Sequence, residues 1–269
     1  MNTIEENATE EIRARVRDRY ARTAREGADA GTAVQTAQAA GYDREQLAAV
    51  PDGANLGLGC GNPTAIDTLK PGEVVVDLGS GGGMDVFIAS RKVGPTGRVY
   101  GFDMTGDMIT LARANAAKGG YTNVEFRLAL IESLPLEDST ADAMISNCVI
   151  NLSPEKARTF REAHRVLKPG GRLMVSDLVV DKPFPPEFAP IVAEYMECGS
   201  RASMYSDYLQ LIRDAGFRKV SVLKNVPLSA SLELTHPSVQ EAMQKYHLSP
   251  ETVRAGLENI RSVSVIAWK

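Results

Sequence analysis

Residues 74–83 read VVVDLGSGGG, an apolar run that leads through an acid into a glycine-rich loop. The run has the length and composition of a buried strand, and residues 84–92 after the loop have a helical pattern. Glycines at a strand-to-helix turn allow positive φ and let the backbone approach a ligand, while the helix N-terminus favours a carboxylate or phosphate. The stretch therefore predicts a nucleotide-type cofactor site, with a tight turn lacking any ligand as the alternative.

The sequence beyond this loop alternates between strand and helix patterns. Strands are expected over 98–102, 124–128, 143–148 and 172–178, the last after a tight turn at 169–171, and helices over 107–118 and 155–167. Such alternation is typical of a parallel sheet with helices on its faces. We therefore predict an α/β fold built on a Rossmann-like, doubly wound, mostly parallel sheet.

The chain is expected to divide into three parts. Residues 1–70 hold an amphipathic helix over 11–25 and a stretch of small residues over 27–61, interpreted as a mobile lid or loop with a short helical piece at 44–49. Residues 71–180 form the core. Residues 181–269 are interpreted as a substrate-side insertion and closing strands, with helical patterns at 192–198, 206–215, 237–246 and 250–259 and strand patterns at 217–223 and 262–268.

Composition narrows the class of partner. The 269 residues carry 30 basic and 34 acidic side chains, so no positive field is available to hold nucleic acid or an anionic membrane. No apolar run approaches the ~20 residues of a membrane span, and residues 1–11 are acidic, unlike a secretory signal. We expect a cytoplasmic protein with a small-molecule partner, and three cysteines that are reduced at rest because their odd number and wide spacing argue against structural disulfides.

The spacing of the glycines specifies the cofactor further. Dinucleotide enzymes favour GxGxxG, whereas here Gly79 and Gly81 are followed by Gly83, with Asp77 before them. This compact pattern resembles motif I of the class I S-adenosylmethionine-dependent methyltransferases, in which the loop curls under the amino-acid part of the cofactor. The resemblance implies the class I methyltransferase fold, with an N-terminal helical lid and a substrate-side insertion near the C-terminus.

Further cofactor contacts are expected along the same edge of the sheet. Asp103 ends the second strand about 20 residues after the loop, where an acid accepts hydrogen bonds from both ribose hydroxyls; an ordinary solvated acid is the alternative. Ile131 and Glu132 match the position that packs against and reads the adenine. The resemblance implies this set of cofactor-binding residues: Tyr20, Asp77, Gly79, Ser80, Gly81, Gly83, Asp103, Met104, Ile131, Glu132 and Asn147.

The cysteines point to the substrate. Cys148 ends the fourth strand at the ligand-binding edge, Cys198 lies in the insertion, and Cys60 lies in the glycine-rich approach to the first strand. Taken alone, each is most often a small buried hydrophobe. However, residues 55–63 (NLGLGCGNP), 103–105 (DMT) and 145–152 (ISNCVINL) resemble the arsenite methyltransferases, and the resemblance covers about 16–223.

The resemblance implies a chemistry for these thiols. Cys148 and Cys198 would hold trivalent arsenic, from arsenite or thiol-bound arsenic, as thiolates, because soft sulfur suits a soft element. Cys60 would supply a third thiol, or a disulfide during turnover. Since methyl transfer formally oxidises arsenic, a thiol reductant of the glutathione or thioredoxin type would reset the enzyme.

Two other functions are compatible with the sequence. A methyltransferase of the same fold could act on carbon or oxygen of a lipid or quinone, and it would need a general base. His164, His236 and His247 are the only histidines, and His164 lies inside an expected helix. A non-catalytic arsenic or metal sensor is the other possibility, although the intact cofactor loop argues against it.

Overall fold

The computed structural model describes residues 3–65, 69–184, 188–230 and 232–269. Eight strands form one sheet in the order β3-β2-β1-β4-β5-β8-β7, with the short β6 pairing with β5. Neighbours from β3 to β5 are parallel, whereas β8 runs antiparallel to β5 and β7. The strands are β1 Val74–Leu78, β2 Arg98–Asp103, β3 Val124–Leu128, β4 Ala141–Asn147, β5 Leu167–Val180, β6 Ser203–Met204, β7 Arg218–Pro227 and β8 Ile260–Trp268.

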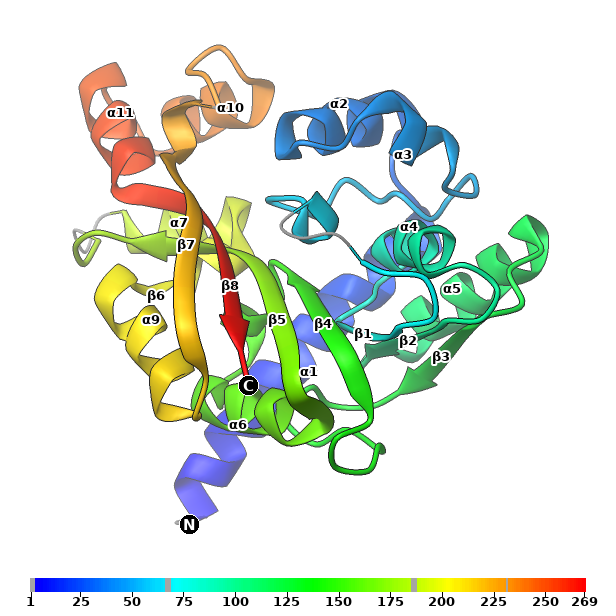
Figure 1. Ribbon diagram of the computed structural model, residues 1–269. Helices are drawn as coiled ribbons and strands as arrows, with labels where there is room; N and C mark the ends of the chain where they lie inside the picture. Colours follow the sequence, from blue (N-terminus) through cyan, green and yellow to red (C-terminus); the bar gives the residue numbers. More distant parts are fainter. Residues whose placement is uncertain (1–2, 66–68, 185–187, 231) are drawn as a thin grey trace.

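Helices lie on both faces of this sheet and above one end of it (Figure 1). In Figure 1, α2 and α3 lie above one side of the sheet and α10 and α11 above the other. The described helices are α1 Thr3–Glu26, α2 Ala30–Ala40, α3 Arg44–Ala48, α4 Met84–Val93, α5 Gly106–Gly119, α6 Lys156–Val166, α7 Ala189–Tyr195, α8 Glu197–Ser200, α9 Tyr205–Asp214, α10 Pro237–Lys245 and α11 Pro250–Asn259, with 3₁₀ turns η1 Pro63–Ala65, η2 Ile150–Leu152 and η3 Leu228–Ala230.

The alternation of side chains along β1 explains the two layers of helices. Val75 packs into the cluster that holds Phe87 of α4, while Val76 packs into the cluster that holds Phe160 of α6. Both valines are fully buried, because successive side chains of a strand point to opposite faces of the sheet. The predicted Rossmann-like, doubly wound, mostly parallel sheet of the class I methyltransferase type is confirmed.

The stretch at 27–61 differs from its prediction as a mobile lid or loop. Residues 30–40 form α2, whose N-cap Asp29 accepts a hydrogen bond from Thr32 N at 2.8 Å and whose C-cap Gly41 has a φ of 102°. Its buried side chains are Ala33, Ala37 and Ala40. The helix was missed because alanine carries little hydrophobic contrast, although it has the highest helix propensity and here recurs at helical spacing.

Smaller differences concern boundaries. β5 begins at Leu167 instead of after the turn at 169–171, with a register irregularity opposite β4 and a φ of 79° at Gly170. β6 was not anticipated. The division of the chain at 70/71 and 180/181 stays a prediction, and its parts include 1–2, 66–68, 185–187 and 231, which lie outside the described residues.

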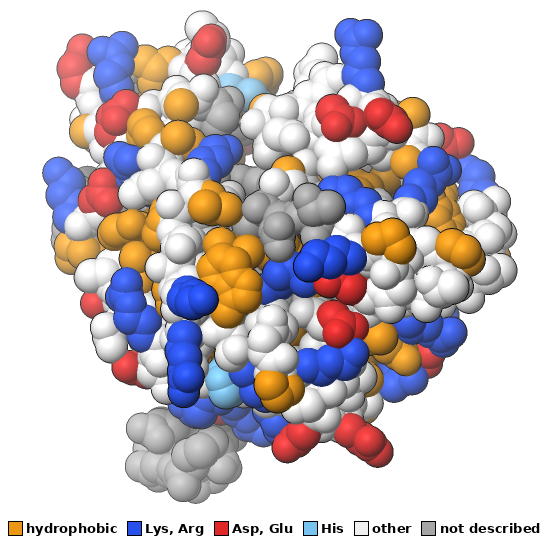
Figure 2. Space-filling model, viewed as in Figure 1, with side chains coloured by type: hydrophobic (Ala, Val, Ile, Leu, Met, Phe, Trp, Pro, Cys, Tyr) orange, Lys and Arg blue, Asp and Glu red, His pale blue; other side chains and the backbone are white. Residues whose placement is uncertain are grey.

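The surface is mixed in character. On the face shown in Figure 2, Lys and Arg are interspersed with Asp and Glu. Among the described helices, none combines the length and the apolar composition that crossing a bilayer requires.

Candidate functional site

The glycine loop joins β1 to α4 at the carboxyl edge of the sheet. The backbone N–H groups of Gly79 and Ser80 donate to Phe102 O at 2.7 and 2.8 Å, which fixes the loop against β2. Gly79, Gly81 and Gly83 have φ values of 72°, 50° and 98°, a region that favours glycine. A Cβ at Gly79 would also lie 2.4 Å from Val149 Cγ1, so both the conformation and the close approach require glycine there.

Three carboxyl groups surround this loop. Asp103 accepts hydrogen bonds from Gly81 N at 3.0 Å and Thr105 N at 2.8 Å, so its carboxylate braces the loop. Burial raises its pKa, although these backbone donors oppose the shift. Burial, together with the charges of Asp85 and Asp103, raises the pKa of Asp77 well above its ordinary value. Burial also raises the pKa of Asp85 to about 6.

A cavity opens over these acids, and its lining fits a cationic cofactor. Asp77, Asp85 and Asp103 all line it, and they would repel the phosphates of a dinucleotide while attracting an ammonium or sulfonium group. Ile131 and Leu152 add an apolar wall suited to a flat ring. The buried Ser80 hydroxyl has no hydrogen-bond partner within the described part of the chain, so it is left for a ligand. The donor set therefore fits S-adenosylmethionine.

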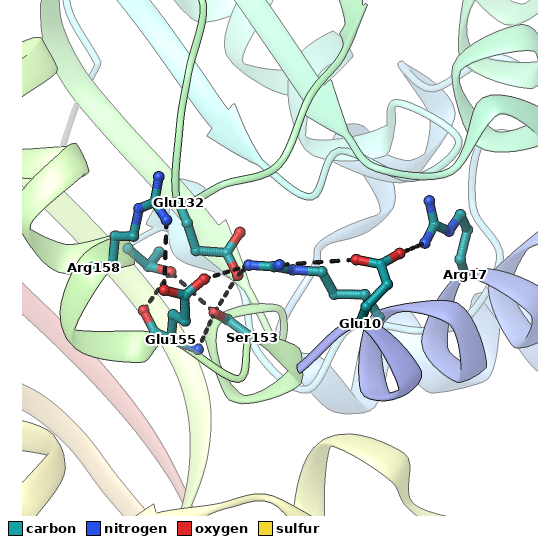
Figure 3. A network of polar contacts seen from close by, with 8 residues as sticks. Glu10, Arg17, Glu132, Ser153, Glu155 and Arg158 are labelled. Atoms are coloured by element: carbon teal, nitrogen blue, oxygen red, sulfur yellow. Dashed lines mark hydrogen bonds and ion pairs between the residues drawn. The ribbon is translucent and has the colours of Figure 1, made fainter. Parts of the chain in front are cut away.

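Helix α1 covers one side of the cavity. Arg13, Val16 and Tyr20 of this helix line it. Arg13 forms ion pairs with Glu132 at 3.4 Å and Glu155 at 2.5 Å, and Ser153 donates to Glu132 at 2.6 Å. Figure 3 shows these contacts joining α1 to the loop after β3 and to the start of α6. The predicted helical lid thus has a polar anchor at the cavity.

The structure brings most of the predicted cofactor residues together. Gly83 is the exception, since it is the N-cap of α4, where a Cβ would lie within 3 Å of Phe87 and Phe126 ring atoms, and it serves helix packing. Sequence reasoning missed Tyr42 and Asp85, which carry no motif of their own. The predicted residues that line the cavity are Tyr20, Asp77, Gly79, Ser80, Gly81, Asp103, Met104, Ile131, Glu132, Asn147 and Cys148.

A polar network connects the cavity to the cysteine loop. Tyr42 donates to Asp85 Oδ1 at 2.6 Å and accepts from Asn147 Nδ2 at 2.9 Å. Asn147 Oδ1 in turn accepts from Cys60 N at 3.2 Å, and Ser262 donates to Cys60 O at 3.0 Å. Both backbone groups of Cys60 are therefore held, which contrasts with the mobile loop predicted for this segment.

Cys60 and Cys148 form a disulfide, although all three cysteines were expected to be reduced at rest. Their Cα atoms lie 5.9 Å apart, within the range that a disulfide spans. Their separation of 88 positions along the chain hides this proximity in the sequence. Cys148 follows β4 directly with a φ of 59°, a conformation that is uncommon outside glycine and that clusters at functional sites.

Cys198 of α8 lies in the same neighbourhood. It packs against the apolar cluster that contains Cys148, Leu178 and Ile260, to which Cys60 also contributes. Burial and the nearby charge of Asp177 raise the pKa of its thiol to about 12. The three cysteines therefore share one packed apolar cluster, which we call the cysteine chamber. Their convergence on the methyl donor stays a prediction, since of the three only Cys148 lines the cavity in the described part of the chain.

A fourth polar side chain reaches the chamber and was missed. The sulfur atoms of Cys60 and Cys148 and a carboxylate oxygen of Asp177 all lie within 4.8 Å of one another, a group that does not include Cys198. Asp177 belongs to β5, next to β4 in the sheet. The sequence could have indicated Asp177 through its place near the carboxyl end of a predicted strand, because ligands of α/β proteins bind at that edge of the sheet.

Comparisons with known proteins agree with this geometry. A methyltransferase domain family matches residues 69–216. An arsenite methyltransferase of Halobacterium salinarum is 44% identical over 79% of this chain and 59% of its own length. The human arsenite methyltransferase is 36% identical over 53% of this chain and 40% of its own, so the chain spans about three fifths or less of these relatives.

A solved structure extends the match. The arsenic(III) S-adenosylmethionine methyltransferase of Chlamydomonas reinhardtii is 31% identical, with a TM-score of 0.61, over 87% of this chain and 72% of that one. With its glycine loop, acid-lined cavity and converging cysteines, the chain belongs to the arsenite methyltransferase family of class I S-adenosylmethionine-dependent methyltransferases.

Proposed function

We propose that this chain transfers a methyl group from S-adenosylmethionine to trivalent arsenic that its cysteine thiolates hold. One observation carries the proposal: Cys148 lines the acid-walled cavity and at the same time pairs with Cys60. An arsenic atom bound to Cys148 would therefore adjoin the cofactor pocket. The relatives named as arsenite methyltransferases support the same substrate.

We assign the cofactor contacts by position. The loop from Gly79 to Gly81 and the Ser80 hydroxyl would hold the amino-acid part, with Asp77 and Asp85 facing its positive charge. Asp103 would accept from the ribose, and Met104, Ile131 and Glu132 would enclose the adenine. Tyr20 of α1 would close the pocket, and Asn147 would border the transferring group. Bound there, S-adenosylmethionine supplies an electrophilic methyl group on a sulfonium sulfur.

The cysteines would hold and orient the acceptor. Cys148 and Cys198 bind arsenic as thiolates in this proposal, with Cys60 as the third thiol, because soft sulfur is the preferred protein ligand of a soft element. Arsenic bound to three sulfurs keeps a lone pair. The reaction rate would come chiefly from aligning that lone pair with the methyl group of a cofactor bound in the cavity. No general base is needed, because the attacking lone pair carries no proton.

The Cys60–Cys148 disulfide fits the electron balance of this reaction. Methylation takes arsenic from the trivalent to the pentavalent state, and two electrons are needed to reverse that change. Two thiols that close a disulfide release two electrons and two protons, which match this requirement. A thiol reductant of the glutathione or thioredoxin type would then return both cysteines to thiols.

The proposal is tested by incubating purified, reduced protein with S-adenosylmethionine, a thiol and arsenite. Methylated arsenicals and S-adenosylhomocysteine should form together. If the protein binds the cofactor but forms no methylated arsenical, arsenic is the wrong acceptor, and a lipid or quinone acceptor becomes the better hypothesis.

The role of Cys60 is tested by Cys60→Ser. If Cys60 resolves the oxidised product, the variant should bind arsenite and complete one turnover, while multiple turnovers slow sharply. If Cys60 is an obligatory ligand, arsenite affinity itself should fall. Wild-type affinity and both rates at wild-type values would exclude both roles.

A further inference from the structure

Asp177 has no part in the proposed methyl transfer, yet it faces both cysteines of the disulfide. Its side chain is fully buried, and a carboxylate oxygen lies within 4.8 Å of the sulfurs of Cys60 and Cys148. The three residues come from separate segments: the loop before η1, the residue after β4, and β5. A buried carboxylate next to two sulfurs is a set of atoms that can ligate a metal ion.

The hydrogen bonds of Asp177 hold it in place without saturating it. Oδ1 accepts from Asn151 Nδ2 at 2.8 Å and from Leu178 N at 2.9 Å, and Oδ2 accepts from the Tyr208 hydroxyl at 3.1 Å. A carboxylate offers about four acceptor positions, so about one is left. These three donors come from η2, β5 and α9, so the orientation of the carboxylate is fixed by the fold.

Two thiolates and one carboxylate form a ligand set that suits zinc. Zinc binds thiolate sulfur at about 2.3 Å and carboxylate oxygen at about 2.0 to 2.2 Å, so neighbouring ligands of a tetrahedral ion lie roughly 3.5 Å apart. After reduction the two sulfurs, which are bonded to each other in the disulfide, must move apart to that spacing. The carboxylate oxygen already lies within 4.8 Å of both sulfurs and needs a shift of about 1 Å. Arsenic, by contrast, favours sulfur throughout its coordination sphere.

The electrostatic surroundings also suit a cation. A divalent ion with two thiolates and one carboxylate leaves a net charge of −1. Lys156 of α6 lies close enough for its charge to act on Asp177, and it would balance that excess. The buried group would then be neutral overall, which removes most of the penalty for burying charge.

We propose that, in the reduced chain, Cys60, Cys148 and Asp177 form a binding site for a divalent cation of the zinc type, with Cys198 outside it. The disulfide must first be reduced to two thiols, either by a dithiol, which gives up two electrons and two protons and becomes a disulfide itself, or by a phosphine, which gives up two electrons and becomes a phosphine oxide while water supplies the two protons. Binding then releases two protons as two sulfur–zinc bonds form. One consequence rests on the proposed function: because zinc and arsenic share two cysteines, zinc should compete with arsenite.

The site is tested by titrating the full chain, reduced with a phosphine, with Co²⁺ and then displacing it with Zn²⁺. We expect one equivalent of Co²⁺ with thiolate charge-transfer absorption. Asp177→Asn and Cys60→Ser should each weaken binding by about 10-fold or more. Cys198→Ser is the matched control and should leave the affinity within about twofold, since Cys198 lies outside the ligand group. Circular dichroism and cofactor affinity would show that the variants fold.

A second measurement needs no variant. X-ray absorption of the wild-type zinc complex should find two sulfur ligands, and three would overturn the proposal in favour of a three-cysteine site. The proposal would also be overturned if the reduced chain bound no stoichiometric metal. It would likewise be overturned if Cys198→Ser lost as much affinity for Co²⁺ as Asp177→Asn. Competition between zinc and arsenite is measured separately, as inhibition of arsenite methylation by added zinc. A chain that binds zinc but methylates no arsenic would refute the proposed function and leave the metal site intact.

Discussion

The cofactor pocket and the cysteine chamber adjoin at Cys148 but are built in different ways. The pocket centres on one contiguous stretch, the loop after β1, with Asp103 added from the neighbouring strand. The chamber is assembled from segments far apart, since Cys60 and Cys148 are separated by 88 positions and a further residue, Asp177, comes from β5. A local motif can therefore identify the pocket, whereas only the tertiary arrangement of strands and loops can specify the complete chamber.

The two regions also differ in electrostatics. The pocket is lined by three acidic side chains, which favour a positively charged ligand. The chamber is largely apolar and keeps the Cys198 thiol protonated through burial. Because of these differences, single substitutions should separate binding of the cofactor from binding of the acceptor, even though Cys148 borders both sites.

The largest expected effect falls on the chamber alone. Cys148→Ser should lower arsenite methylation by at least about 100-fold, because a serine hydroxyl is a poor substitute for soft thiolate, and Cys198→Ser should also lower it. The affinity for S-adenosylmethionine, measured by calorimetry, should stay within about twofold in both variants. Wild-type methylation rates in both variants would remove arsenic from the chamber.

The next effect falls on the pocket alone. Asp103→Ala leaves the N–H groups of Gly81 and Thr105 without their acceptor and should weaken cofactor binding by roughly 2 to 3 kcal/mol. Arsenite affinity should be unchanged. Asp138→Ala, which removes an exposed acid paired with Arg165, is the matched control. An unaltered dissociation constant in Asp103→Ala would exclude this residue from the cofactor site.

A pH titration tests whether the pocket carboxyls are held at a cost in stability. The pKa of Asp85 is raised from 3.8 to about 6 by burial, so the folded chain binds more protons than the unfolded chain between these values. The free energy of unfolding should therefore fall by about 2 kcal/mol as the pH rises from about 4 to about 6. Asp85→Asn should remove this part of the slope, and the exposed Asp52→Asn should not. Identical slopes in both variants would contradict the assignment.

The smallest effect concerns the connection between the two regions. Tyr42→Phe removes the hydroxyl that joins Asp85 to Asn147 and should lower the free energy of unfolding by about 1 kcal/mol. The comparison variant is Tyr121→Phe, whose hydroxyl donates to Ala49 O at 2.6 Å and accepts from Arg91 Nε at 3.3 Å. Because the contact with Arg91 is exposed to water, this substitution should lower the free energy of unfolding by less. Urea denaturation measures both. An equal or larger loss in Tyr121→Phe would show that the Tyr42 network adds no stability of its own.

The success of the sequence prediction follows the same division. The β1 strand, its glycines and Asp103 were predictable because their pattern is local and each residue type has a physical reason at its position. The α2 helix was not, since its buried face consists of alanines that give almost no hydrophobic contrast. Tyr42 and Asp85 also escaped prediction, because a lone tyrosine and a lone acid become a pair only when α4 packs beside the segment after α2.

The sequence by itself determined the α/β class and the cofactor loop, because these depend on residue type and short-range spacing. The assignment of the thiols as substrate ligands came from the family resemblance and stays a proposal. The tertiary structure alone decided that Cys60 pairs with Cys148, that Asp177 stands beside them and that Cys198 lies outside that group. The physical reason is the tertiary arrangement. Placing β4 next to β5 brings Cys148 near Asp177, and hydrogen bonds of the Cys60 backbone with Asn147 and Ser262 hold Cys60 at the same edge of the sheet. Nothing in the spacing along the chain records these distances.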